Sequence, residues 1–463
     1  FWAMRQPGGP LAATSASADL YPLSGSATVL PGEPSGPTDV VLLATDNGSG
    51  SKRVVTRVKL GGDLDEGELT WKSDPLPSDV YTASFAADAE TVYVGAGDEV
   101  RSLSLRTGEE RWRASLTDKV TTGCPDCFRI VDGTLVVRTD DSYLTGFSTE
   151  SSEPRWSRRL ASPSAAASIV GGSVLLVDDP PDAQALTEVT TIAPADGKVV
   201  RTFAPSCPQS PDTPFPIEMS AGDPVHAVPG TGDLVAAFGF GYGCIVRWEA
   251  ATGAVRWATP LPDGNFEDEQ PPVITATDLV VTKTSGSLRV DLATGRATPL
   301  EPVPDADTQP KAVVGTTLLA ETTSTRGTTR GGLAAFDLAS GRRLWSTQLE
   351  SGAQPVSRGR YRSSDALFDG SPRTLLVTTG PTPLLLTFEG ETREILRQEL
   401  DVATGELTRG TERQFVSRFG SSGTPSITVE SVDARSLLLS VDSIIEVVPL
   451  SGEGPIATWP EPR

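Results

Sequence analysis

One unit of sequence recurs along the chain, and this repetition restricts the fold more than any other feature. Its clearest copy is residues 91–116, TVYVGAGDEVRSLSLRTGEERWRASL. Residues 92–95 predict a short strand, and residues 100–105 alternate apolar and polar side chains as a half-buried strand does. Gly108 then tolerates the positive φ of a tight turn, and a strand with Trp112 follows. The unit therefore predicts at least three consecutive antiparallel strands.

Further copies of the unit fill most of the chain. Residues 234–261 and 333–349 are clear copies, whereas 134–160, 173–203, 287–300 and 375–409 are weaker. The turns that mark the copies fall at residues 67, 108, 152, 197, 253, 295, 341, 405 and 452. Their spacing of 41 to 64 residues is typical of a four-stranded propeller blade. We therefore expect an all-β chain that forms a single β-propeller of four-stranded blades.

The segments LSLRTGEERW, WEAATGAVRW and FDLASGRRLW resemble the pyrroloquinoline-quinone-type repeat of a β-propeller family. The resemblance covers nearly the whole chain and implies seven or eight blades, of which we expect eight, so that one turn mark would lie outside a blade. It also implies that Trp and Gly residues of neighbouring blades dock against each other. The residues expected in this docking are Trp71, Trp112, Trp156, Trp257, Trp345, Gly108, Gly253 and Gly341.

The repeats run through the chain without a change in composition, which predicts one large domain. We assign residues 37–463 to the propeller and residues 1–36 to an N-terminal linker with a closing strand at 27–30. That strand is expected to join the last blade, because a closed ring leaves no open sheet edge. No window of the sequence keeps a helical period, and 45 Gly and 38 Pro residues interrupt it at strand-length intervals.

The charge and hydropathy of the chain exclude two classes of partner. A net charge of −21 would repel nucleic acid and anionic lipid. No run of about 18 apolar residues is present, so this segment is not expected to insert into a membrane. The chain begins at Phe1, and we expect it to follow a signal peptide or anchor. Its expected location is therefore outside the cytoplasm or at the cell surface. We expect the protein to be a monomer.

The four cysteines are expected to form structural disulfides, as in exported proteins. They are Cys124, Cys127, Cys207 and Cys244, and three pairings are open. Proximity favours Cys124 with Cys127 and Cys207 with Cys244, and the second bond would clamp the proline-rich insertion 204–230 onto its blade. The blade topology predicts all four on one face of the disc.

Other uses of the cysteines are less consistent with the sequence. Cys124 and Cys127 have the spacing of a dithiol redox motif but no helix N-terminus to lower a thiol pKa. Haem attachment would require His where Phe128 stands. A four-thiolate zinc site would need two ligands from a distant blade.

The remaining candidates for ligand binding are weak. His226 is the only histidine and is expected to be an ordinary strand or loop residue. The acidic stretch 263–269 lacks the Gly and Glu of a helix-loop-helix calcium site. A second insertion, 348–372, carries an arginine cluster at 358–362 that could hold an anionic ligand. No metal ligand or catalytic residue is assigned.

The sequence therefore favours a non-enzymatic binding or scaffolding module, or a sensor ectodomain, whose partner is another protein or a surface ligand. The alternative is a quinoprotein-type oxidoreductase with a redox cofactor in the propeller funnel. In the family that the repeats resemble, such enzymes carry adjacent cysteines and a calcium site, and this chain matches neither, so no cofactor is expected. A carbohydrate-active propeller would need paired carboxylates across the funnel, which the sequence does not place.

Overall fold

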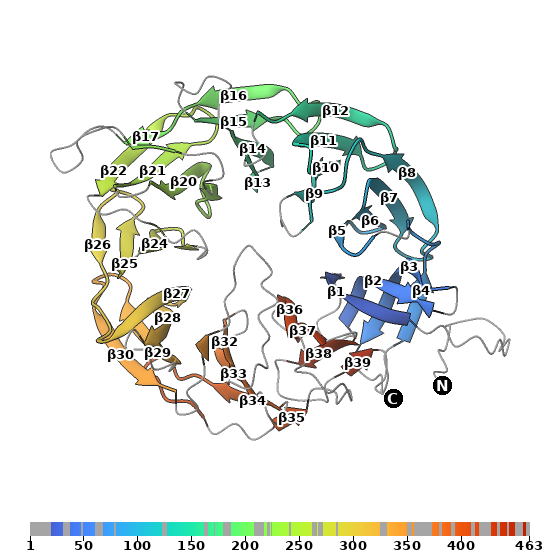
Figure 1. Cartoon of the computed structure of the whole chain (residues 1–463). Coiled ribbons are helices and arrows are strands. Elements are labelled where there is room, and N and C mark those ends of the chain that lie inside the picture. Colours follow the sequence, from blue (N-terminus) through green and yellow to red (C-terminus); the bar gives the residue numbers. More distant parts are fainter. Residues whose placement is uncertain are drawn as a thin grey trace.

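The protein is described from a computed structural model, shown in Figure 1. The residues that the structure describes are 20–30, 38–47, 50–60, 68–77, 80–122, 127–161, 165–170, 172–178, 187–207, 217–219, 223, 225–239, 242–261, 266, 272–283, 286–324, 331–349, 354–355, 373–378, 382–389, 394–408, 413–415, 427–432, 436–441, 444–449 and 457–459.

Eight sheets of the described chain have four antiparallel strands each, joined in simple chain order. They are β1 (Leu20–Val29), β2 (Thr38–Asp46), β3 (Lys52–Leu60), β4 (Glu68–Lys72); β5 (Ala83–Ala87), β6 (Thr91–Ala96), β7 (Glu99–Ser104), β8 (Glu110–Ser115); β9 (Phe128–Val131), β10 (Thr134–Arg138), β11 (Tyr143–Ser148), β12 (Pro154–Arg159); β13 (Ala166–Val170), β14 (Ser173–Asp178), β15 (Glu188–Ile192), β16 (Val199–Phe203); β19 (Val225–Ala227), β20 (Asp233–Phe238), β21 (Gly243–Glu249), β22 (Val255–Leu261); β23 (Val273–Ile274), β24 (Asp278–Lys283), β25 (Gly286–Asp291), β26 (Ala297–Pro299); β27 (Ala306–Val314), β28 (Thr317–Ser324), β29 (Gly331–Asp337), β30 (Arg343–Gln348); and β36 (Ile427–Val432), β37 (Ser436–Val441), β38 (Ile444–Pro449), β39 (Ala457–Trp459).

Two further sheets depart from the four-stranded plan. The short hairpin of β17 (Ser206–Cys207) and β18 (Ile217–Glu218) lies in the first insertion. The other sheet has five strands: β31 (Gln354–Pro355), β32 (Arg373–Val377), β33 (Leu384–Glu389), β34 (Glu394–Glu399) and β35 (Arg413–Phe415). In it β31 pairs with β32 in parallel, and turn mark Gly405 falls between β34 and β35.

The sheets stand around a ring, with each fourth strand on the outside (Figure 1). The all-β propeller of four-stranded blades is confirmed, and the described residues contain the eight four-stranded sheets expected. The five-stranded sheet also takes a place in the ring, beside β36–β39 in Figure 1, and the expected count had not included it.

The N-terminal strand closes the ring differently from the expectation. Ala27 lies in β1 opposite Leu42 of β2, so β1 belongs to the first sheet and does not join the last one. It packs instead against β36 and β37, while β3 contacts β39. The ring is therefore closed by side-by-side packing of the first and last sheets.

The hydrophobic core is divided among the seams between neighbouring sheets. The second strand of a blade is covered on both faces, which explains why β6 reads as a nearly continuous apolar run and is buried throughout. One cluster of buried side chains fills each of seven consecutive seams, from that between β1–β4 and β5–β8 to that between β27–β30 and β31–β35. No blade could bury both of its faces alone, so the blades stabilise one another.

Candidate binding surfaces

Most of the tryptophans chosen from the sequence lie in the seams. Trp71 covers Gly108 of the next blade so closely that a Cβ there would lie 2.6 Å from the indole Cε3. The Trp71 indole also donates a hydrogen bond to Leu105 O at 2.8 Å. The same close approach joins three further pairs, Trp156 with Gly197, Trp257 with Gly295 and Trp345 with Gly405. These indoles are engaged between blades; Trp71 and Trp156 are buried, whereas Trp257 and Trp345 are partly exposed.

Three expected docking residues have other neighbours. Trp112 stacks against Phe147 at a ring distance of 6.2 Å and donates to Thr149 O at 3.2 Å. Gly253 faces Phe203, and Gly341 faces the backbone of residue 299. The sequence selection left out Gly197, Gly295 and Gly405, although each occupies the turn position of a repeat. Aligning the turn glycine of each repeat with the tryptophan of the preceding repeat would have identified these three glycines.

Arginines of third strands form a second link across seams, which the sequence analysis did not anticipate. Arg247 pairs with Asp233 at 2.6 Å in its own sheet and donates to Leu292 O of the next sheet at 2.5 Å. Arg57 repeats the arrangement with Asp39 at 2.9 Å and with the carbonyl of residue 105 at 2.7 Å. Both ion pairs are largely buried, so these two guanidinium groups link neighbouring blades and are not available to a ligand.

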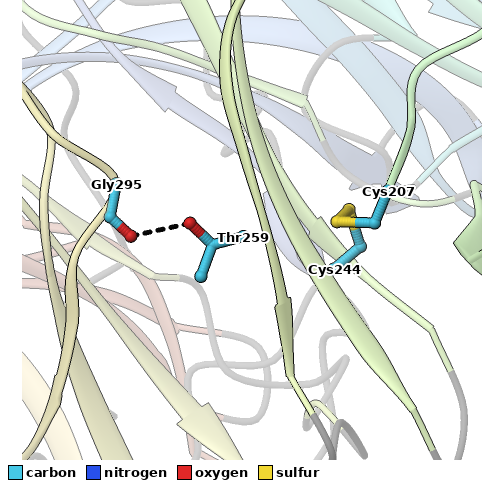
Figure 2. The surroundings of a disulfide bond; sticks show 4 residues. All are labelled: Cys207, Cys244, Thr259 and Gly295. Atoms are coloured by element: carbon cyan, nitrogen blue, oxygen red, sulfur yellow. Dashed lines mark hydrogen bonds between the residues drawn. A yellow bond between two sulfur atoms is a disulfide. The ribbon is translucent and has the colours of Figure 1, made fainter. Parts of the chain in front are cut away.

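The first insertion is attached to the β19–β22 sheet by a disulfide bond (Figure 2). Cys207 of β17 and Cys244 of β21 are bonded, with Cα atoms 5.7 Å apart, and neither side chain is exposed. This pairing is the one predicted from proximity. Cys127 is also disulfide-bonded, and its predicted partner, Cys124, lies outside the described residues. Figure 2 also shows Thr259 of β22 donating to Gly295 O across the next seam, at 2.7 Å.

Apolar side chains reinforce this attachment. Ile217 of β18 and Met219 are buried with Cys207 in the cluster that contains Phe238 and Trp248. The hairpin of β17 and β18 contacts β21, and β17 also contacts β22. The residues that flank the segment 208–216 are thereby fixed to the β19–β22 sheet, and the segment itself lies outside the described residues.

A pocket of about 400 Å³ lies where β23, β27 and β32 meet. Its lining is mainly apolar, and Lys311 carries the only charge in it. The register of β27 shifts at Lys311, whose Nζ lies 3.0 Å from Glu321 Oε2. Glu321 is 1% exposed, and its other oxygen accepts the N–H of Leu376 at 3.1 Å. The charge of Lys311 is therefore already balanced, and the pocket presents no unpaired acid or base.

The other sequence candidates add no site. His226 lies half-buried in β19 opposite Val235. The acidic stretch apart from Phe266, and the arginine cluster at 358–362, lie outside the described residues. Within the described part of the chain, no group of three His, Cys, Asp or Glu side chains is placed to hold a metal ion. The same part contains no helix able to cross a membrane.

A model of one protein family matches residues 55–204 and 187–409, and its description is "Outer membrane protein assembly factor BamB". The two matches overlap and span most of the chain. This chain belongs to the BamB family. The predicted resemblance to pyrroloquinoline-quinone-type propellers is thereby confirmed. Among curated proteins no sequence matches the chain closely enough to count as a relative.

Solved structures similar to this BamB-family chain are distant from it. BamB from Moraxella catarrhalis is 14% identical over 95% of each chain, with a TM-score of 0.37. The dihydro-heme d1 dehydrogenase NirN is 18% identical over 83% of this chain and 75% of its own, with a TM-score of 0.45. A quinohemoprotein alcohol dehydrogenase from Pseudomonas putida HK5 is 15% identical over 78% and 69%, with a TM-score of 0.43.

Proposed function

We propose that the chain is a non-enzymatic binding module that holds a protein partner on a rigid propeller outside the cytoplasm. The observation that carries this proposal is the insertion fastened to the β19–β22 sheet by the Cys207–Cys244 bond. Binding segments in rigid scaffolds are commonly loops whose ends are held by the core. A disulfide that closes such a loop reduces the conformational freedom to be lost when a partner binds.

The disulfides also support the proposed location. Disulfide bonds persist in oxidising compartments and are rare in cytosolic proteins of mesophiles. Cys207, Cys244 and Cys127 are all bonded, and the first two are completely buried. The family description, an assembly factor, is consistent with a protein as partner. We propose that the module itself is monomeric.

A redox enzyme is the competing function. Its cofactor would need a cavity with groups that bind and activate it. The pocket near β27 is at the small end of the range for ligands, and its single cation is already paired with Glu321. This arrangement favours a binding module over an oxidoreductase.

Site-specific crosslinking in cells would test the proposal. Residues 208–216 would be replaced by a short Gly-Ser linker, which keeps Cys207 and Cys244 in place. A photoreactive residue at the exposed position of Ala227 reports the partner in both forms. We expect a discrete crosslinked protein with the native insertion and at least a tenfold loss with the linker.

A control replaces residues 284–285, which join β24 to β25, by the same linker and should leave the crosslink intact. Purified protein would also be titrated with calcium and pyrroloquinoline quinone while its absorbance is recorded. Saturable quinone binding without any insertion-dependent crosslink would overturn the proposal in favour of the enzyme.

A further inference from the structure

The outer strands of the ring are cationic in a protein that is otherwise strongly anionic. The fourth strands of the eight four-stranded sheets together carry eight arginines and one lysine against two glutamates. The whole chain, by contrast, has 60 acidic and 39 basic residues. Because each fourth strand faces outward, this excess of positive charge lies on the rim of the disc (Figure 1).

On three of the five fourth strands that contain arginine, namely β8, β22 and β30, a carboxylate lies near the guanidinium group. Arg113 of β8 lies 2.8 Å from Glu110 in the same strand. Longer ion pairs join Arg111 to Glu90 at 3.7 Å, Arg256 to Glu249 at 3.6 Å and Arg343 to Glu301 at 3.8 Å. These strands therefore present little net field to a partner.

Strands β12 and β16 are exceptions. Arg201 of β16 donates to Thr252 O and forms no ion pair with a described residue, but β12 carries more arginines. Its sequence, PRWSRR, contains three arginines and no acid. Arg155 donates to two neutral hydroxyl oxygens, at 3.0 Å to Thr134 and at 3.2 Å to Ser148. Arg158 and Arg159 form no ion pair with any described residue, and Arg159 is exposed. Strand β12 is therefore the fourth strand with the largest number of arginines that lack a carboxylate partner among the described residues.

The backbone of β12 is also open on one side. Its sheet runs in the order β12-β11-β10-β9, so no strand of the described chain pairs with the outer edge of β12. Such an edge can accept an additional strand through main-chain hydrogen bonds. In the β31–β35 sheet an insertion of the same chain supplies an additional strand, β31, which pairs with β32 at the inner end of the sheet and not at its outer edge.

We propose that β12 docks an acidic, extended segment of a partner protein, which adds to the β9–β12 sheet as a fifth strand. Arg158 and Arg159 are neighbours in the regular part of β12, so they project from opposite faces of the sheet. Arg155 lies where the register between β11 and β12 shifts, and adds a third guanidinium group beside them. Carboxylates on both faces of the added strand would meet these guanidinium groups. The inference rests on the proposed function and names a docking surface for it.

The overall charge of the protein makes this site selective. An acidic segment is repelled by a chain of net charge −21 but attracted where three arginines lack acidic partners. Charged side chains on an edge strand can also serve only to prevent unwanted pairing. If the arginines of β12 only prevent such pairing, an acidic strand should not bind. The experiments below distinguish this result from the proposal.

The test uses a fluorescent, end-blocked peptide in which pairs of glutamates alternate with pairs of valines, so that an extended strand carries carboxylates on both faces. Its binding to the full chain is measured by fluorescence anisotropy. We expect saturable binding that weakens at least tenfold in the variant R155Q/R158Q/R159Q. The matched variant R111Q/R113Q/R256Q removes the same number of rim arginines and should stay within about twofold of wild type. Circular dichroism and intact Cys207–Cys244 confirm that both variants are folded.

Two further probes separate strand addition from simple charge attraction. Two peptides, N-methylated at the odd or at the even positions, keep their charges but each loses the hydrogen-bond donors along one edge. We expect at least a tenfold loss of affinity for one of the two. Amide hydrogen exchange in β12 should slow when the unmethylated peptide binds. Equal binding of all methylated forms, or equal loss in both arginine variants, would overturn the proposal.

Binding to vesicles of phosphatidylglycerol tests whether the arginines of β12 recognise an anionic lipid surface instead of a peptide. Binding of vesicles that depends on the β12 arginines, without peptide binding, would replace the proposal with a lipid surface. Failure of the peptide while the insertion-dependent crosslink persists would sink this inference and leave the proposed function standing. If that crosslink is lost while the peptide still binds β12, the proposed function fails and the docking surface on β12 stands.

Discussion

Two neighbouring seams of the ring are built in different ways. Between β9–β12 and β13–β16, Trp156 covers Gly197, where an added Cβ would lie 2.4 Å from the indole, and its N–H donates to Pro194 O at 2.6 Å. Between β13–β16 and β19–β22, Phe203 occupies the tryptophan position, and an added Cβ at Gly253 would lie 3.3 Å from its ring. The second docking contact is looser and lacks the hydrogen bond.

The second seam gains its stability from other contacts. Trp248, on the third strand of its sheet, is fully buried there, and Phe203 meets it edge to face at a ring distance of 5.5 Å. The disulfide-bonded Cys207 lies in the same cluster. The comparison teaches that a blade can lose the outer tryptophan when interior packing and a covalent bond replace it.

Removing the tryptophan of the first seam should have the largest effect. We expect Trp156→Ala to lower the free energy of unfolding by about 4 kcal/mol, because a large buried side chain and its hydrogen bond are lost. The matched variant, Phe203→Ala, should cost clearly less. Denaturant unfolding followed by fluorescence and circular dichroism compares the two. Equal losses would contradict the difference between the seams.

Removing the covalent bond of the second seam should have the next largest effect. We expect Cys207→Ala/Cys244→Ala to cost about 3 kcal/mol, since the closed loop no longer limits the unfolded chain. Denaturant titration of the wild type and of the double variant, both without a reductant, measures this loss and leaves the disulfide of Cys127 intact. A double variant as stable as the wild type would show that apolar packing alone holds the hairpin.

A glycine pair isolates the docking contact itself. Gly197 and Gly253 have nearly the same φ, +66° and +69°, so alanine pays a similar backbone cost at both, about 1 kcal/mol. Gly197→Ala must also displace Trp156 and should cost about 2 kcal/mol, whereas Gly253→Ala should cost little more than the backbone term. Thermal unfolding of both variants measures the difference, and a greater loss at Gly253 would reverse the comparison.

A third kind of seam, between β5–β8 and β9–β12, should respond to pH. Burial, and secondarily Asp88, raises the pKa of Tyr93 from near 10 to about 12. The unfolded chain therefore loses this proton first, so the contribution of Tyr93 is complete below about pH 10 and is lost as the pH rises towards 12. Tyr93→Phe should flatten the fall in stability over that interval, measured against wild type. An unchanged slope would exclude Tyr93 as its source.

The repeats predicted the fold and much of the docking because each unit carries its own turn and aromatic strand. The Cys207–Cys244 pairing also followed from their positions around an insertion. Docking at Gly253 and Gly341 did not follow, because the partner of each glycine belongs to the preceding blade and is not a tryptophan there. The place of β1 depends on which of two sheets it pairs with, and the sequence pattern of a strand is the same in both cases.

The sequence by itself determined the architecture, because a period of strands and turns that cannot bury its own faces must stack into a ring. It also determined the composition of the rim, since the arginines recur beside the tryptophans of the outer strands. Only the tertiary structure decided which of those arginines are neutralised. Arg343 meets Glu301 across a seam, 42 residues away, whereas Arg159 meets no carboxylate among the described residues. Charge pairing depends on distances between blades, and those distances are set by packing.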